Sequence, residues 1–163
     1  MIKSTDKLRG KRVYMSLSAI YTHSKNAELV KDIIHKTMPE FRKLLDLPSD
    51  LNFRVAPIKA RSTNGSYDSD YKLVNIDCRL SYAKALEVLA HELVHAEQYH
   101  TNKLKKKFIG RKGWMHYWNG EIGKKGTTYK AYRDQPWEQE AWGRQAVLAE
   151  QVCLILGERL YEP

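Results

Sequence analysis

The sequence predicts an α+β fold: a single domain in which a small, mainly antiparallel sheet packs against one central helix, with further helices towards both ends of the chain. Apolar residues recur at the three- and four-residue spacing of a helix in residues 25–47, 81–100 and 136–156. Short segments rich in β-prone residues, bounded by turn signals, lie between these helices. The chain has 163 residues, which is enough for one domain with a moderate core.

The first part of the chain predicts a basic arm followed by a helix. Residues 1–12 carry five cations and few apolar groups, which indicates a flexible arm before a domain that spans residues 13–163. Residues 13–21 fit either a short strand or the start of a helix. Residues 25–47 have the apolar pattern of an amphipathic helix. Pro39 interrupts this pattern, so we expect a kink there or a break into two helices.

Two strands are expected before the central helix. Residues 51–60 fit the first strand, with Pro57 marking an edge position or a bulge. Asn64-Gly65 is a tight-turn signal. Residues 71–80 fit the second strand, which leads directly into the central helix.

The second half of the chain contains a basic segment, an aromatic hairpin and a closing helix. Six of the ten residues in 103–112 are Lys or Arg, which favours a solvated loop, with a nucleic-acid contact surface as the alternative. Residues 113–132 are rich in β-prone aromatic residues and predict a hairpin that turns at 119–120 or at 125–126. Pro136 suits the first turn of the closing helix.

Composition excludes several classes of protein. No run of 18 apolar residues exists, so no membrane span is expected, and the short, interrupted apolar stretch near the start does not predict a signal peptide. Cys78 and Cys153 are the only cysteines and do not form a Cys-x-x-Cys pair, which argues against a disulfide framework and a zinc ribbon. We therefore expect a reducing cytoplasm as the compartment, which is the host cytoplasm if the protein is viral.

The helix predicted at 81–100 contains a His-Glu-x-x-His motif made of His91, Glu92 and His95. Residues four apart share one face of a helix, so the two imidazoles can bind one metal ion. Glu92 lies about 100° round the helix from His91, where its carboxylate can accept a proton from a water beside that metal. Apolar residues surround the motif and predict that the helix is mostly buried. Buried histidines and a buried glutamate need partners, and a zinc ion would supply one.

A catalytic zinc site usually has three protein ligands and one open position for water. The candidates for the third ligand are His100, His116, Glu138 and Glu140. His100 lies on the motif helix itself and points away from the other two ligands. In the closing helix Glu138 falls in the first turn and Glu140 about 200° further round, so only one of these carboxylates can meet the metal. His116 lies in the aromatic hairpin, where an imidazole can simply pack.

The stretch PWEQEAW, which follows the hairpin, resembles the second helix of the gluzincin metallopeptidases. The order of elements over residues 25–155 also resembles small cytoplasmic and phage-type minimal zincins. In these families the second helix carries the zinc-binding glutamate, often within Glu-x-Glu-Ala-Asp, and the first Glu is the ligand. The resemblance therefore implies that Glu138 is the third ligand. Where many members have the Asp, this chain has Trp142.

This resemblance implies a zincin-like fold and a zinc-dependent metallopeptidase. Zn²⁺ would be bound by His91, His95 and Glu138, and a zinc-activated water would hydrolyse the peptide bond with Glu92 as the general base. The substrate would be a protein or peptide that lies along a sheet edge, for which the strand at 71–80 is a candidate.

Other residues have candidate supporting roles. Asp77 or Asp134 could orient a ligand histidine, although a surface turn is the simpler role for each. Tyr129 and Tyr132 fit the core or rim of the hairpin, and nothing in their spacing selects either for stabilising an oxyanion. Glu140 fits a supporting position or a salt bridge on the closing helix.

Two alternative functions follow from the same residues. In the SprT-like family, which is associated with DNA–protein crosslink proteolysis, a third His follows the motif; His116 could take that place, and the basic residues 103–112 would suit DNA. Such a protein would be a DNA-associated protease or a DNA-binding zinc protein, but Tyr117 stands where that family usually has Gly. The other alternative is a non-catalytic interaction protein with a zincin fold. Glu92 argues against it, because a structural zinc site needs no general base.

Overall fold

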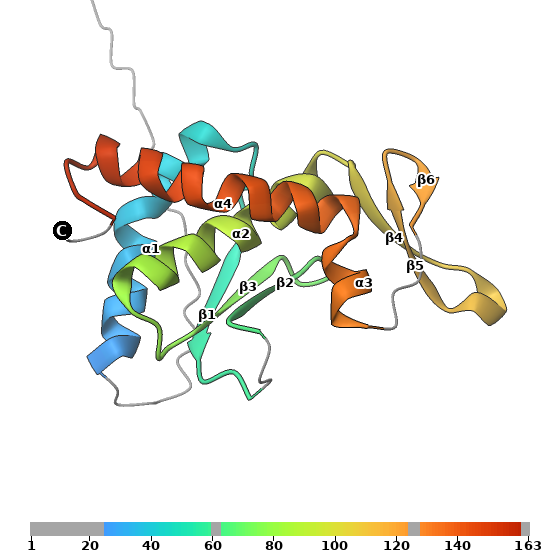
Figure 1. Cartoon of the computed structure of the whole chain (residues 1–163), viewed down its shortest axis with the longest axis horizontal. Coiled ribbons are helices and arrows are strands. Elements are labelled where there is room, and N and C mark those ends of the chain that lie inside the picture. Colours follow the sequence, from blue (N-terminus) through green and yellow to red (C-terminus); the bar gives the residue numbers. More distant parts are fainter. Residues whose placement is uncertain (1–24, 60–62, 124–127, 161–163) are drawn as a thin grey trace, which may run out of the picture.

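The computed structural model describes residues 25–59, 63–123 and 128–160 (Figure 1). The arm expected at 1–12 and the segment 13–21 lie outside these residues. Within the described residues the chain forms four α-helices, one short 3-10 helix and six strands in two three-stranded sheets. The predicted α+β class is confirmed, but the sheet is divided in two, because the strands before and after the central helix do not pair with each other.

Helix α1 (Lys25–Leu44) is uninterrupted. Of the two outcomes expected at Pro39, the break into two helices is wrong, since this residue lies inside the helix and is exposed. Proline in a helix interior costs about 3 kcal/mol. Continuing the helix buries Met38 and Phe41 on the face that already contains Ile34, and each such side chain contributes about 1.5–3 kcal/mol. Burial on this face therefore outweighs the cost of the proline.

The first sheet has the order β1-β3-β2, formed by β1 (Asn52–Ala56), β2 (Gly65–Asp68) and β3 (Leu73–Asp77). Strand β1 pairs with β3 in parallel, and β2 pairs with β3 antiparallel. The two strands predicted at 51–60 and 71–80 are confirmed, although both are shorter than expected. Strand β2 was not expected from the sequence.

The tight turn predicted at Asn64-Gly65 is wrong, because Gly65 begins strand β2. The turn between β2 and β3 falls instead at residues 69–72. There the carboxylate of Asp68 accepts a hydrogen bond from the backbone N–H of Asp70 at 2.9 Å. A hydrogen bond from a backbone N–H to the aspartate side chain two residues earlier defines an Asx turn, which favours a bend in the chain.

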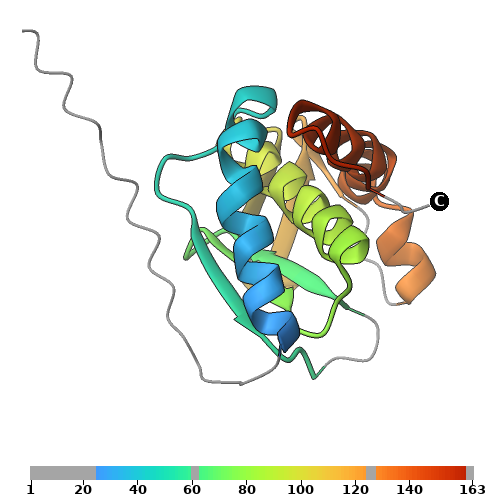
Figure 2. The ribbon, with the colours of Figure 1, turned by 90° about the vertical axis from the view of Figure 1, so that its left-hand side faces the viewer.

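Helix α2 (Tyr82–His100) is the centre of the molecule, as predicted, and it lies between α1 and α4 (Figure 2). Its other neighbours are β2 and β3 of the first sheet and strand β4 (Leu104–Phe108), which follows α2. Ser81 occupies the N-cap position, but its side chain makes no capping hydrogen bond. Helix α4 (Pro136–Ile155) has Pro136 in its first turn, as predicted. In the described part of the chain, no helix combines the length and the apolar character needed to cross a membrane.

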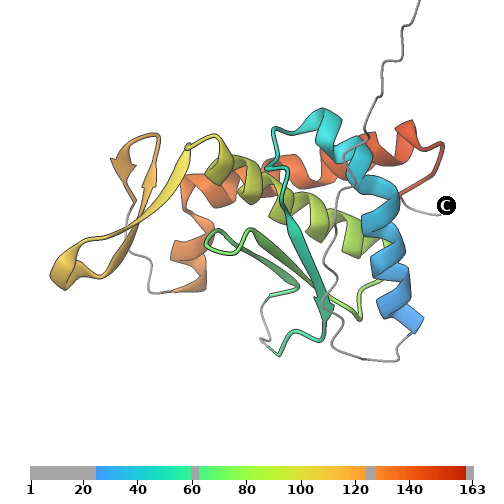
Figure 3. The ribbon, with the colours of Figure 1, turned by 180° about the vertical axis from the view of Figure 1, so that it is seen from behind.

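The second sheet consists of β4 (Leu104–Phe108), β5 (Trp114–Trp118) and β6 (Glu121–Ile122), all antiparallel. It extends past the C-terminal end of α2 (Figures 1 and 3). The basic loop expected at 103–112 is wrong. Lys105, Lys106 and Lys107 lie on β4, Lys103 comes immediately before this strand, and Lys112 ends the 3-10 helix η1 (Gly110–Lys112). Pairing of every β4 residue with β5 explains why this charged segment is extended.

The hairpin turn between β5 and β6 is at residues 119–120, one of the two predicted places. Asn119 has φ 49° and Gly120 has φ 89°, as the commonest two-residue hairpin turn requires. The hairpin does not extend to residue 132. Residues Tyr129–Arg133 instead form helix α3, whose first turn is capped by the Thr128 side chain accepting a hydrogen bond from a backbone N–H.

Candidate metal centre

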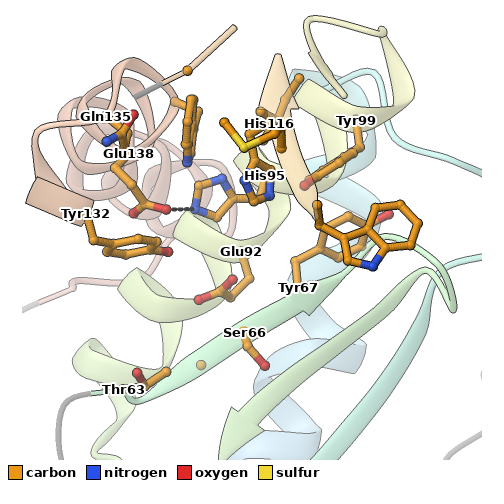
Figure 4. A pocket seen from close by; sticks show the side chains of 16 residues that line it. Thr63, Ser66, Tyr67, Glu92, His95, Tyr99, His116, Tyr132, Gln135 and Glu138 are labelled. Carbon is orange, nitrogen blue, oxygen red and sulfur yellow. Dashed lines mark ion pairs between the residues drawn. The ribbon is translucent and has the colours of Figure 1, made fainter. Parts of the chain in front are cut away.

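Two helices bring three potential metal ligands together. His91 and His95 project from α2, and Glu138 projects from the first turn of α4. Figure 4 shows the Glu138 carboxylate facing the His95 imidazole. The Nε2 atoms of His91 and His95 are 3.2 Å apart. Glu138 places Oε1 3.3 Å from Nε2 of His95 and Oε2 3.5 Å from Nε2 of His91. This group could hold a metal ion, and its carboxylate is only 2% exposed.

Each ligand histidine is oriented by a glutamine. Nδ1 of His91 is 3.0 Å from Oε1 of Gln145, and Nδ1 of His95 is 2.9 Å from Oε1 of Gln98. With the amide oxygens accepting, both Nδ1 atoms carry a proton, so the neutral form of each imidazole has its lone pair on Nε2, directed at the centre of the group. The interaction fixes the tautomer that a metal ligand requires.

Sequence reasoning missed both glutamines. Gln98 lies three residues after His95, and Gln145 lies two turns after Glu138, so helical spacing is a signal that could have identified them. Of the two carboxylates considered for this role, that of Asp77 binds the Arg79 guanidinium at 2.5 Å, and Asp134 occupies the C-cap position of helix α3.

Trp142 packs against the His91 ring, with 5.0 Å between the ring centroids. The guanidinium of Arg133 lies 4.5 Å above the Trp142 ring. Trp142 therefore covers one side of the histidine but accepts no hydrogen bond from it. The acceptor comes from one turn further along α4, at Gln145.

The ionisable side chains of this centre determine its charge even without a bound metal. Burial by itself would raise the pKa of Glu138, but hydrogen bonds from His91 and His95 outweigh it and lower that pKa to about 2. Burial also opposes a charge on His95, yet the Glu138 carboxylate and then Glu92 raise the pKa of His95. Glu138 is therefore an anion in any neutral solution, as a carboxylate ligand must be.

Glu92 lies beside this group in the same cavity and is 6% exposed. Burial is the main cause that raises the pKa of Glu92, and it outweighs the attraction of the two histidines. A carboxylate with a raised pKa is a better proton acceptor than an ordinary surface glutamate.

The position of Glu92 depends on a glycine in the neighbouring strand. A Cβ atom at Gly65 would lie 2.6 Å from Cγ1 of Val88 and 3.0 Å from Oε1 of Glu92. Strand β2 therefore approaches α2 more closely than any side chain at this position would allow. The residue taken for a turn signal is the one that lets the first sheet close over Glu92.

The other candidate ligands lie elsewhere. The Glu140 carboxylate binds the Lys103 ammonium at 2.7 Å and the Arg144 guanidinium at 3.4 Å, which agrees with the predicted supporting role. His100 lies 3.6 Å from Asp46. His116 lines the same cavity as Glu92 but packs on the Trp137 ring, at 5.3 Å between centroids. Burial, followed by the charge of Lys106, lowers the pKa of His116.

The cavity in front of the metal group has a volume of about 450 Å³. Figure 4 shows Tyr132 and Gln135 on one side of it and Tyr67 and Tyr99 on the other. Burial, and then a hydrogen bond to the Glu138 carboxylate, raise the pKa of Tyr132. The Tyr132 hydroxyl thus keeps its proton and remains a hydrogen-bond donor. Its place on α3, rather than on a hairpin strand, brings it to the site.

Comparison of the chain with protein-family models, with curated proteins and with solved structures finds no match.

Proposed function

We propose that this protein is a zinc-dependent metallopeptidase in which His91, His95 and Glu138 bind Zn²⁺ and Glu92 is the general base. The convergence of two imidazole nitrogens and one buried carboxylate, beside a second buried carboxylate and an open cavity, is the observation that carries the proposal. The expected gluzincin-like order of ligands, with the glutamate on a second helix, is consistent with it. Because neither Cys78 nor Cys153 belongs to a redox motif, we keep the cytoplasm as the expected compartment.

The spacing of the donor atoms fits zinc. Ligand atoms about 2.0–2.2 Å from a tetrahedral zinc ion are about 3.3–3.5 Å from one another. The three separations in this group range from 3.2 to 3.5 Å. Two neutral imidazoles with one carboxylate are also a donor set found in zinc hydrolases. The ligands need little movement to bind the ion.

When bound, Zn²⁺ would polarise a substrate carbonyl and make a water easier to deprotonate. Glu92 would accept the proton from that water and then donate it to the leaving amine, since its raised pKa suits both transfers. Gln98 and Gln145 would hold the two imidazoles in place during this change. Tyr132 could donate a hydrogen bond to the charge that develops on the carbonyl oxygen.

The peptide would bind along strand β2. The strand expected to provide the edge, at 71–80, is the central strand of its sheet, so that expectation is wrong. Strand β2 is one of the two edge strands of this sheet, and its residues Gly65, Ser66 and Tyr67 line the cavity beside Glu92. An extended peptide could therefore add its backbone to β2 and place one of its carbonyl groups near the metal group.

Zinc content and hydrolysis test this proposal together. We expect one zinc per chain in the purified protein, a large loss of zinc in His91→Ala and in His95→Ala, and loss of peptide hydrolysis on chelation. His35→Ala, which changes an exposed histidine on α1, is the matched control and should keep its zinc. Equal zinc content in all three variants and the wild type would exclude this metal centre.

A further inference from the structure

A second cavity, of about 420 Å³, adjoins the first. Tyr67, Tyr99 and Leu104 line both cavities, so the two adjoin at these side chains. The rings of Tyr67 and Tyr99 lie against each other, with centroids 5.9 Å apart. A substrate that occupies the first cavity can therefore extend into the second without leaving the protein surface.

The second cavity is strongly cationic. Four lysines and one aspartate are among the described residues that line it: Lys72, Lys105, Lys106, Lys107 and Asp70. The first cavity differs, because its charged lining groups among the described residues include two glutamates, Glu92 and Glu138, and no lysine. The positive charge is thus placed beside the proposed reaction centre and not within it.

Two of these lysines have no carboxylate partner among the described residues. Lys72 binds Asp50 at 2.7 Å, and Lys106 lies 3.5 Å from Asp70. For Lys105 and Lys107, both exposed on β4, the described part of the chain provides no such ion pair. Their ammonium groups remain available to an anionic ligand.

A short extended peptide could reach from the first cavity to the second. Strand β2 begins at Gly65, beside Glu92, and its following turn reaches the second cavity at Ser69. Four residues of extended chain span about 13 Å. A peptide paired with β2 would therefore present side chains to the second cavity three to four residues away from the bond that is cleaved.

We propose that the second cavity is a subsite for acidic side chains, so that the substrates are polypeptide segments with Asp or Glu a few residues from the scissile bond. This proposal rests on the proposed peptidase function. Ion pairs with Lys105 and Lys107 would supply the selectivity, and the peptide backbone on β2 would supply the register.

The lining of this cavity favours an acidic polypeptide over a nucleic acid. Single-stranded nucleic acids bind where bases can stack on open aromatic faces. The aromatic side chains among the described lining residues of the second cavity are Tyr67 and Tyr99, and their rings lie against each other with centroids 5.9 Å apart. Nearby on the second sheet, Lys106 covers Trp114 at 4.8 Å and Lys107 covers Tyr117 at 5.1 Å, so one face of each ring is already occupied.

The test is a binding measurement with zinc-loaded Glu92→Gln protein, which should hold substrate without cleaving it. The probes are dye-labelled peptides that share one neutral core and carry Glu, Gln or Lys on either side of it. Their binding is measured by fluorescence anisotropy. We expect the Glu-flanked peptide to bind most tightly. The double substitution Lys105→Gln/Lys107→Gln in the same background should weaken the affinity for this peptide about 3- to 10-fold, the range for losing two exposed ion pairs. It should leave the affinity for the Gln-flanked peptide unchanged.

The control for charge is Lys31→Gln/Lys84→Gln, which removes two lysines from α1 and from the start of α2. Lys84 is separated from the second cavity by most of α2, about 24 Å at the helical rise. This control should bind the Glu-flanked peptide as the parent does. Equal binding of the Glu- and Gln-flanked peptides, or equal weakening by both double variants, would overturn the subsite.

Two further results separate the subsite from the peptidase function. If the Glu-flanked peptide binds through Lys105 and Lys107 but wild-type protein cleaves none of the peptides, the subsite stands and the peptidase function fails. If the Gln-flanked peptide is cleaved but acidic flanks give no advantage, the function stands and the subsite fails. Displacement of the acidic peptide by a short oligothymidylate that binds more tightly would assign the lysines to nucleic acid and overturn the proposal.

Discussion

Replacing Gln145 by Leu should weaken zinc binding without removing a metal ligand. In the structure Oε1 of Gln145 accepts the hydrogen bond from Nδ1 of His91, and Gln145 is 9% exposed. Leu fills a similar volume but cannot accept this bond. The imidazole must then leave its N–H unsatisfied or turn away from the metal, and either response reduces the fraction of protein ready to bind zinc.

The magnitude follows from the burial of this N–H group. An unsatisfied buried donor costs about 1–3 kcal/mol. Since 1.4 kcal/mol corresponds to a tenfold change in a binding constant, zinc affinity should fall about 5- to 150-fold. This range overlaps the 10- to 100-fold effect typical of removing a group that orients a metal-bound histidine.

The assay is a zinc titration in competition with a chromophoric chelator, with circular dichroism to confirm that the variant is folded. Gln151→Leu makes the same change at an exposed position of the same helix and should keep the wild-type affinity. Gln145→Glu restores an acceptor and should also retain zinc. Wild-type affinity in Gln145→Leu, or an equal loss in Gln151→Leu, would refute the reasoning.

Three other predictions concern the same centre. Gly65→Ala should reduce hydrolysis far more than zinc binding, because its Cβ would press on Glu92 Oε1 from 3.0 Å; comparing kcat with zinc content checks this. Glu138→Ala should lose most of its zinc, whereas Glu140→Ala and His116→Ala should keep it, as measured by atomic emission. In the metal-free protein, the stabilisation contributed by the ionised Glu138 should be fully present above pH 4.5 and should be lost as the pH falls towards 2, because the folded state lowers the pKa of Glu138. Urea titrations should show a smaller loss in Glu138→Gln.

The parts of the site that were predictable are those set by local spacing. His91, Glu92 and His95 lie within one helical stretch, and the turns of a helix decide which of them share a face. Glu138 is on a different helix, and its arrival at the histidines depends on how α2 and α4 pack. Helical geometry separated it from Glu140, but only the resemblance to gluzincins assigned it as the ligand. The structure places the two carboxylates as that assignment requires.

The parts that were missed depend on tertiary contacts. Strand β2 has no alternating apolar pattern, and it forms because Gly65 lets the backbone close on α2. The lysines of β4 suggested a loop, because a run of charged residues that does not alternate with apolar residues does not indicate a strand. Their extended conformation comes from pairing with β5, where Lys106 and Lys107 rest on aromatic rings. Gln145 could not be assigned to His91 before the two helices were placed side by side.

The network around Glu140 shows how the basic strand is connected to the metal centre. Gln98, which orients His95, donates hydrogen bonds from Nε2 to the Trp137 carbonyl at 3.0 Å and to Glu140 at 3.2 Å. Glu140 also binds Lys103, immediately before β4. Glu140 therefore links the second sheet to the glutamine that orients one of the histidines, while the Trp137 carbonyl would still hold Gln98 when Glu140 is replaced.

The most direct test of the central claim is peptide hydrolysis by wild-type and Glu92→Gln proteins at equal zinc content. Gln has nearly the shape of Glu but cannot accept the proton of the water at neutral pH. We predict that the wild type cleaves an unstructured peptide, that Glu92→Gln binds as much zinc, and that its hydrolysis rate falls at least about 100-fold. Cleavage by Glu92→Gln at the wild-type rate would contradict the account.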